Sequence, residues 1–224
     1  MAHNKADTRV LHTALAFCVL LTTPTCLLHA QQFEPELRLA FDLALVNPSG
    51  EVVGTEVGVG GVSVDIDSKA GAGLRLEYRF SPVLGVEFGL LGTSSFDVNV
   101  GNLGDGVGVE TGISSFTPLT IGLNYHFPTN QSLDLFAGPF LAFVRYGDVG
   151  VQTGIGGVVT SENVDSDTGW GVILGIDLPL GSSNWLLQSN LRYIDTSLTG
   201  SSSEGRFDGD FDPLIFSIGF GYRF

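Results

Sequence analysis

The sequence predicts an all-β fold, an eight-stranded antiparallel transmembrane β-barrel, and two observations lead to this prediction. Eight segments match β-strands, and seven of them alternate large apolar residues with Gly, Ala or polar residues, as strands between lipid and a confined lumen do. The links between them are alternately short and long, which places short periplasmic turns at one end and long extracellular loops at the other. A soluble sandwich has no reason to keep that asymmetry.

Residues 1–30 are expected to be a secretory signal peptide, and residues 31–224 the barrel. Two basic residues precede an apolar run over 10–28 that is short and impure for a spanning helix, and Ala30 is a small residue suited to cleavage. No later stretch reaches the roughly 20 apolar residues that a spanning helix needs. A membrane protein built from this chain must therefore be a closed barrel, and we expect it in the bacterial outer membrane.

Composition narrows the chemistry of the mature chain. Both cysteines, Cys18 and Cys26, lie in the predicted signal peptide, so no disulfide or cysteine metal ligand is expected. Lipid attachment at Cys26 is disfavoured because Thr-Pro-Thr precedes it. Cleavage leaves 8 basic and 23 acidic residues, a net charge of −15, which excludes a general nucleic-acid partner.

The eight strands differ in how clearly they alternate. In the segment 214–224 every even-numbered residue is large and apolar, whereas Ser217, Gly219, Gly221 and Arg223 form the other face. The segment 133–146 is the exception, because it is apolar on both faces. In chain order, strands are expected over 37–45, 74–80, 84–90, 119–127, 133–146, 170–178, 185–193 and 214–224.

The connections and the aromatic residues fit this arrangement. The short links, rich in turn-forming residues, are 81–83, 128–132 and 180–184, and the long polar or Gly-rich links lie near 47–68, 99–114, 148–167 and 200–211. Aromatic residues gather beside the short turns and the C-terminus, where an interfacial girdle belongs. They are Tyr78, Phe80, Tyr125, Phe127, Trp185 and Phe224.

Several motifs together suggest a family. They are Ala44-Leu-Val-Asn-Pro-Ser-Gly50, the hairpin from Leu76 to Phe88, Phe116-Thr-Pro-Leu119, and Leu191-Arg-Tyr-Ile-Asp-Thr196 followed by Asp212-Pro and the strand ending Gly-Tyr-Arg-Phe224. With these motifs the chain resembles the OmpW-like outer-membrane proteins over nearly the whole mature sequence. The resemblance implies an eight-stranded barrel with an apolar interior, linked to passage of small hydrophobic molecules. The Gly- and Asp-rich loops depart from the family pattern and leave the ligand open.

Outer-membrane barrels often end in an aromatic-rich strand that the barrel assembly machinery reads, so Tyr222 and Phe224 are the expected assembly signal. Outer-membrane lipid and lipopolysaccharide are the expected surroundings, and small hydrophobic molecules the expected cargo.

Inward positions near the short turns are charged or polar, and charges in a narrow lumen must pair. We expect a cross-linked network with a structural role, although a functional one stays open. Its charged members are Arg38, Arg75, Glu77, Arg79, Glu87, His126, Asp134, Asp177, Arg192 and Arg223, with Asn124, Gln188 and Asn190 beside them.

Toward the long loops the inward set becomes apolar, which suits either a pocket for a hydrophobic ligand or simple filling of the barrel. This set is Leu91, Phe116, Pro118, Phe136, Phe140 and Val144. Pro118 and Pro139 interrupt backbone pairing, so either could mark an opening in the wall through which a ligand leaves sideways into lipid.

Three other motifs are interpreted as non-functional. Gly58-Val-Gly60-Gly61 lacks the strand–loop–helix context of a phosphate loop. The aspartates at 165, 167, 208, 210 and 212 fit no complete calcium loop and are expected to be solvated tips rather than a cation site. His126, the one histidine of the mature chain, has no nearby serine in its strand, so catalysis is not expected.

The sequence therefore predicts a non-enzymatic barrel, without cofactor or metal, that admits small apolar solutes. The alternative is a structural or surface-interaction barrel with a plugged, non-conducting lumen.

Overall fold

A computed structural model describes residues 33–49, 52–54, 64–100, 109–113, 115–129, 133–147, 149–152, 159–162, 165–202 and 205–224. The predicted signal peptide and the Gly58–Gly61 motif lie outside these residues. No helix in the described ranges is long and apolar enough to cross a membrane.

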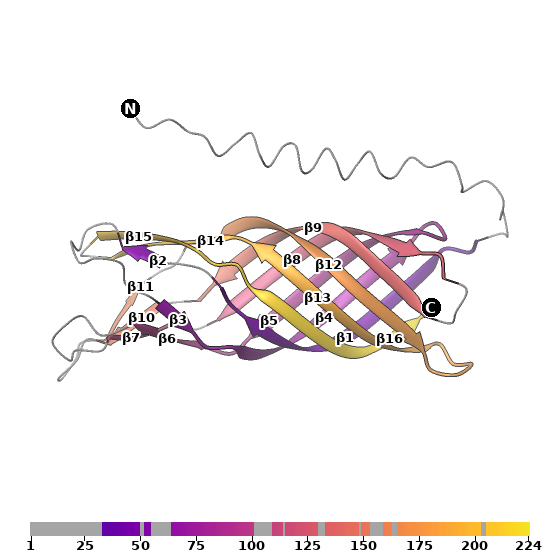
Figure 1. The fold of residues 1–224 in the computed structure, drawn as a ribbon, viewed down its shortest axis with the longest axis horizontal. Helices are drawn as coiled ribbons and strands as arrows, with labels where there is room; N and C mark the ends of the chain where they lie inside the picture. The colour runs from indigo at the N-terminus through magenta and orange to yellow at the C-terminus, as the bar shows by residue number, and fades with distance from the viewer. Residues whose placement is uncertain are drawn as a thin grey trace, which may run out of the picture. The chain divides into compact units, whose positions relative to one another are not determined.

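Eight antiparallel strands close into a barrel, in the order β1-β16-β13-β12-β9-β8-β5-β4 (Figure 1). The first and last strands pair with each other, which completes the wall. All eight predicted strands are confirmed. They are β1 (Glu36–Asn47), β4 (Lys69–Arg79), β5 (Leu84–Thr93), β8 (Phe116–Phe127), β9 (Asp134–Tyr146), β12 (Asp167–Pro179), β13 (Trp185–Asp195) and β16 (Leu214–Arg223).

The strands form where they do because each separates lipid from lumen. In β1 the burial pattern alternates without a break, with Leu43 60% exposed on the outer face while its neighbours Asp42 and Ala44 are buried. The segment that is apolar on both faces, β9, turns Phe140 inward and Leu141 outward. An apolar belt therefore surrounds the barrel, as a membrane-spanning wall requires.

Replacing Leu43 by Arg should test this belt. A charge on the lipid face near the middle of a strand costs about 2–4 kcal/mol of unfolding free energy. Urea titration of the purified barrel in lipid vesicles would measure the loss. Ala44→Ser, one residue along and facing the lumen, is the matched control and should change stability by less, so an equal loss in both variants would contradict the lipid assignment of Leu43.

Two of the short links, between β4 and β5 and between β12 and β13, are tight reversals at one end of the barrel. Between β12 and β13, Gly181 has a φ of 65°, a left-handed conformation that glycine adopts at no steric cost. The Leu180 N–H donates to the Trp185 carbonyl at 2.9 Å, closing the turn. Between β4 and β5, the Ser81 hydroxyl accepts the Leu84 N–H at 2.9 Å. These local bonds fix the register of both hairpins.

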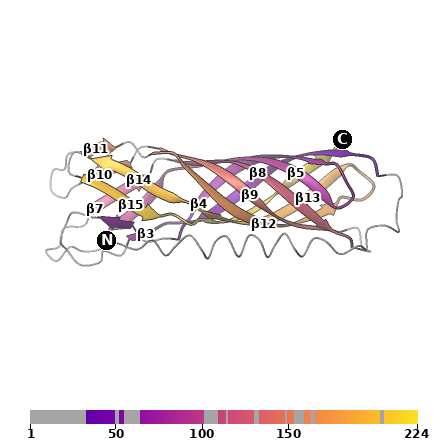
Figure 2. The ribbon, with the colours of Figure 1, turned by 90° about the horizontal axis from the view of Figure 1, so that it is seen from above.

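The long links contain more strand than the sequence predicts. Eight short strands form a five-stranded sheet and a three-stranded sheet, and they gather at the end of the barrel away from the C-terminus (Figures 1 and 2). Their Gly-rich and polar composition hides the alternation by which a strand is recognised. They are β2 (Val52–Gly54), β3 (Val64–Ile66), β6 (Phe96–Val100), β7 (Val109–Ile113), β10 (Val149–Gln152), β11 (Val159–Glu162), β14 (Ser197–Ser202) and β15 (Gly205–Asp210).

Candidate functional site in the barrel lumen

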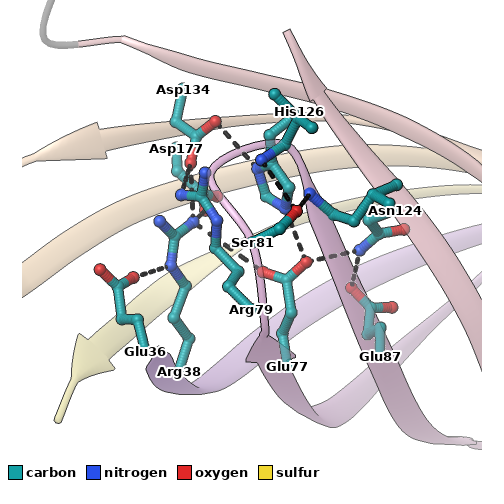
Figure 3. A network of polar contacts seen from close by, with 12 residues as sticks. Glu36, Arg38, Glu77, Arg79, Ser81, Glu87, Asn124, His126, Asp134 and Asp177 are labelled. Atoms are coloured by element: carbon teal, nitrogen blue, oxygen red, sulfur yellow. Dashed lines mark hydrogen bonds and ion pairs between the residues drawn. The ribbon is translucent and has the colours of Figure 1, made fainter. Parts of the chain in front are cut away.

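The half of the lumen nearer the short turns is filled by a network of charged side chains, here called the charged plug (Figure 3). Polar contacts join side chains from β1, β4, β5, β8, β9, β12 and β13 across the barrel. The plug consists of Arg38, Asp42, Arg75, Glu77, Arg79, Glu87, His126, Asp134, Asp177 and Arg192.

Two pairs of like charges lie directly opposite each other on neighbouring strands of the plug. Asp134 of β9 faces Asp177 of β12, and Arg38 reaches across from β1 to donate to both at 2.8 Å. Like charges in such positions repel. The cation from the far wall offsets that repulsion, so the plug ties distant strands together.

The second pair is Glu77 and Glu87, on β4 and β5. The Asn124 amide lies between them and donates to Glu77 at 3.0 Å and to Glu87 at 3.1 Å. Both donors of one amide group are thus used on two carboxylates. Asn124 acts as a neutral bridge inside the plug.

His126 is held by carboxylates on both sides. Its Nε2 lies 2.8 Å from Glu77 and its Nδ1 lies 2.9 Å from Asp134, while the side chain is 1% exposed. Ionised carboxylates only accept hydrogen bonds, so both ring nitrogens must donate, which only the imidazolium form does. His126 therefore serves as a further cation of the plug.

Deeper in the barrel, Arg75 and Arg192 share Glu87. Arg192 donates to Glu87 at 2.5 Å, and Arg75 donates to its other oxygen at 3.2 Å. Arg75 also donates to Asp42 at 2.6 Å and to Gln188 at 3.0 Å. Asp42 is a member of the network that the sequence analysis does not predict, although its inward position in β1 is a usable signal.

Two members of the predicted network lie at its margin. Arg79 donates to Asp134 at 2.8 Å and to the Pro82 carbonyl at 2.6 Å. Arg223 is half-buried, and within the described ranges no ion pair to it is found. Both line a cavity of about 350 Å³ at the short-turn mouth.

Above the plug, apolar side chains pack into one buried cluster, here called the apolar layer. Five residues predicted for the apolar lumen belong to it: Leu91, Phe116, Phe136, Phe140 and Val144. Pro118 also faces inward and is buried. Other members were not named from sequence, namely Ala44, Val46, Ala142, Ile173, Ile194, Phe211 and Ile215.

Phe136 lies lower in the barrel than expected. The sequence predicts it toward the long loops, but it pairs in register with His126, and the two rings lie 5.4 Å apart. Its ring covers Gly175 on the neighbouring strand, and the ring of Phe140 covers Gly171 in the same way. A side chain at either glycine would overlap the ring, so the glycines make room for the aromatic residues.

At the loop end of the apolar layer three aromatic rings meet. Phe116 lies 5.4 Å from Phe211 and 6.0 Å from Tyr146, and the last two are 5.7 Å apart. The Tyr146 hydroxyl lies 3.1 Å from the Thr196 hydroxyl, which donates to Asp167 at 2.8 Å. Phe211 lies in the link before β16, outside every alternating segment, so no pattern in the sequence pointed to it.

The boundary between the plug and the apolar layer contains a small cavity of about 20 Å³. Polar residues, among them Asp42, Arg75 and Arg192, line one side. Apolar residues line the other, including the inward Leu91 and the outward-facing Leu90. The cavity lies where the plug meets the apolar layer and has room for about one water molecule.

The wall beside this cavity has a short unpaired seam. The ladder between β5 and β8 stops at the pair Leu90 and Leu119, although β5 continues to Thr93 and β8 begins at Phe116. Pro118, which has no N–H, lies next to the last pair. The Phe116 N–H donates to the Thr93 hydroxyl at 3.1 Å and closes the seam at its upper end.

Pro139 behaves differently from Pro118. The ladder between β8 and β9 also skips two pairs at this point, between Gly122–Phe140 and Tyr125–Ala137. The backbones are nevertheless in close contact, because a Cβ atom on Gly138 would overlap the Leu123 carbonyl. The strands are therefore in contact beside Pro139, which makes Pro118 the stronger candidate for an opening.

The described aspartates near the loops act as hydrogen-bond acceptors. Asp167 accepts the Ser197 N–H at 2.7 Å, and Asp212 accepts the Thr196 N–H at 3.3 Å. In the described ranges no three His, Cys, Asp or Glu side chains form a group that could hold a metal ion. The side chain of Asp208 lies outside the described residues.

Comparison with known proteins agrees with this architecture. The family described as outer membrane protein beta-barrel domain matches residues 14–224. No curated protein matches the chain in sequence. OprG from Pseudomonas aeruginosa is similar in structure with a TM-score of 0.61 and 21% identity, over 84% of this chain and 95% of OprG.

AlkL, solved in DMPC lipid bilayers, has a TM-score of 0.59 and 22% identity, over 88% of this chain and 93% of AlkL. Neisserial surface protein A has a TM-score of 0.52 and 13% identity, over 84% and 97%. OprG and AlkL are OmpW-family barrels, so the resemblance to that family is confirmed at the level of the fold. From its closed eight-stranded wall and the match over residues 14–224, the chain belongs to the outer-membrane protein β-barrel family.

Proposed function

We propose that this barrel admits small hydrophobic molecules at its loop end and releases them sideways into the outer membrane. The observation behind the proposal is the division of the lumen into an apolar layer above an ion-paired plug. Apolar walls suit an apolar solute, whereas the plug fills the straight path toward the short turns. The chemistry of the lumen thus favours a lateral route over an axial one.

The seam between β5 and β8 is the proposed exit. There the ladder is unpaired beside Pro118, and Leu90, Leu91 and Pro118 are among the residues that line the boundary cavity. Separating the strands at this position costs fewer backbone hydrogen bonds than in the fully paired parts of the wall. A solute held in the apolar layer would therefore leave here most easily.

The alternative is a structural or surface-interaction barrel, and the packing of the apolar layer favours it. Phe116 and Val144 are almost fully buried, and the boundary cavity is far smaller than a drug-sized pocket of about 300 Å³ or more. Conduction consequently requires the aromatic side chains to move. In both proposals the barrel is non-enzymatic, because both ring nitrogens of His126 are engaged with carboxylates.

Uptake of a hydrophobic dye separates the two functions. Cells with and without the protein would be given N-phenylnaphthylamine, which fluoresces in lipid, and the rate of brightening measured. Phe140→Asp places a charge in the apolar layer, where an unpaired charge costs several kcal/mol, so uptake should fall to the protein-free rate. Phe143→Leu, on the lipid face of the same strand, should keep the native rate. Equal uptake in all strains would contradict the uptake function and favour the structural or surface-interaction function.

A reversible cross-link tests the exit. Continuing the β5–β8 register brings Gly92 opposite Thr117, inside the unpaired seam. Gly92→Cys with Thr117→Cys should form a disulfide under oxidation that holds the strands together. We expect dye uptake to fall when the bridge forms and to recover with reductant. Each single cysteine variant, which cannot form the bridge, serves as the control. Equal dye uptake by the oxidised and the reduced double-cysteine variant would contradict the lateral exit.

A further inference from the structure

The basic side chains of the barrel are divided unevenly between the lumen and the outer wall. Four arginines belong to the plug, and Arg223 lines the short-turn mouth of the lumen. Lys69 occupies an inward position of β4. Among the basic residues whose side chains the structure describes, only Arg145 of β9 faces outward.

Arg145 lies where the apolar belt ends on its strand. Along the outer face of β9, Leu141 is 51% exposed and Phe143 is 46% exposed, and Arg145 is the next outward residue before the strand ends at Tyr146. Among the described residues no carboxylate forms an ion pair with Arg145. Its guanidinium is therefore an uncompensated cation at the border between the apolar belt and the loops.

Hydroxyl groups flank Arg145 on both neighbouring strands. Thr117 of β8 lies opposite Arg145 in the register, and Thr168 of β12 lies opposite Phe143, one outward position away. Both threonines have the outward parity of their strands. The carboxylate beside Thr168, that of Asp167, has inward parity and accepts the Ser197 N–H at 2.7 Å. The outer face thus presents a guanidinium between two hydroxyls, a set of donors that suits phosphate oxygens.

The wall between this group and the middle of the belt is apolar. Phe143 lies opposite Leu119, and Leu141 has Ile121 on one side and Trp170 on the other. All five side chains are exposed on the outer face. A tryptophan at the edge of the belt is typical of the level at which lipid headgroups begin. Acyl chains can therefore lie along this surface while their headgroup remains beside Arg145.

We propose that the outer face of β8, β9 and β12 binds an anionic membrane lipid with a phosphate headgroup, in the leaflet at the loop end. The phosphate accepts from Arg145, Thr117 and Thr168, and the acyl chains lie along the apolar wall. At the edge of β13 the exposed residue is Asp195, which repels such a headgroup. The inference concerns the outer wall and does not depend on the proposed uptake function.

Quenching of tryptophan fluorescence by brominated lipid tests the site. The chain has two tryptophans, Trp170 and Trp185, so Trp185→Phe leaves Trp170 as the reporter beside the proposed lipid. The barrel would be reconstituted in phosphatidylcholine vesicles containing increasing fractions of either brominated phosphatidic acid or brominated phosphatidylcholine. We expect half-quenching of Trp170 at about a fivefold lower fraction of phosphatidic acid, the preference that one arginine gives near an anionic lipid surface.

The preference should depend on Arg145 alone among the arginines tested. In Arg145→Gln both brominated lipids should quench Trp170 equally, whereas Arg223→Gln, which removes an arginine at the opposite mouth, should keep the native preference. Circular dichroism would verify that each variant has the strand content of the native barrel. Equal quenching by both lipids in the native barrel, or an unchanged preference in Arg145→Gln, would overturn the inference.

A competition experiment separates a lipid headgroup from a free anion. Inorganic phosphate added to the vesicles should lower the preference for phosphatidic acid no more than sodium chloride does at the same ionic strength, because the acyl chains contribute to lipid binding. A larger loss with inorganic phosphate would mean that the site takes a free anion, and the assignment to a lipid would be wrong.

Discussion

Replacing Arg75 by Leu should lower the unfolding free energy of the barrel by about 3–5 kcal/mol, the cost of breaking a buried ion pair from one side. Arg75 is buried, and it is the cation found paired with Asp42 among the described residues. Without it, the Asp42 carboxylate is left charged in a narrow lumen. Urea unfolding in lipid vesicles, followed by the fluorescence of Trp170 and Trp185, would measure the change.

The loss should be recovered in part when the unpaired charge is removed as well. In Arg75→Leu combined with Asp42→Asn, the neutral amide no longer needs a cation, so the double variant should be more stable than Arg75→Leu alone. Arg145→Leu, which removes an outward-facing arginine, should change stability by about 0.5 kcal/mol or less. If Arg75→Leu lowers the unfolding free energy by no more than Arg145→Leu does, the plug contributes little to stability.

The strands of the barrel could be predicted because alternation is a local property of the chain. Each residue of β1 or β16 faces either lipid or lumen, and that environment selects its polarity independently of distant partners. The inward direction of Arg38 or Glu77 follows from the same parity. The fold and the polarity of the lumen were therefore readable from single segments.

The contacts inside the lumen could not be predicted in this way. Arg38 meets Asp177 across 139 positions of sequence, and no pattern within β1 or β12 selects that partner. Opposed like charges such as Asp134 and Asp177 would even count against the pairing of their strands. The depth of Phe136 was misjudged for a related reason, because strand tilt and stagger set the level of each residue in a barrel.

Phe211 and the seam between β5 and β8 show two further limits of prediction from the sequence. Phe211 enters the apolar layer from a link, where neither alternation nor spacing indicates which way a side chain points. Pro118 and Pro139 are equivalent as sequence signals, since each lacks an N–H. Their surroundings differ, because Gly138 lets the strands approach closely beside Pro139, whereas the ladder beside Pro118 stops.

Removing the ring of Phe136 should be the other large effect, a loss of about 3–5 kcal/mol of unfolding free energy in Phe136→Ala. The side chain is 1% exposed and covers Gly175, so truncation leaves a cavity in the apolar layer. The size of the loss also bears on function, because a packed ring contributes this much, whereas a ring lining an open pocket contributes less.

A double-mutant cycle makes that distinction sharp. Gly175→Ala alone should destabilise the barrel by about 1–3 kcal/mol, since its methyl group would overlap the Phe136 ring. In the Phe136→Ala background the same methyl group would enter the cavity, so its penalty should vanish or change sign. Additive effects would mean that the ring does not rest on Gly175 in the membrane. The packing of Phe136 against β12 would then differ in the membrane from the arrangement described above.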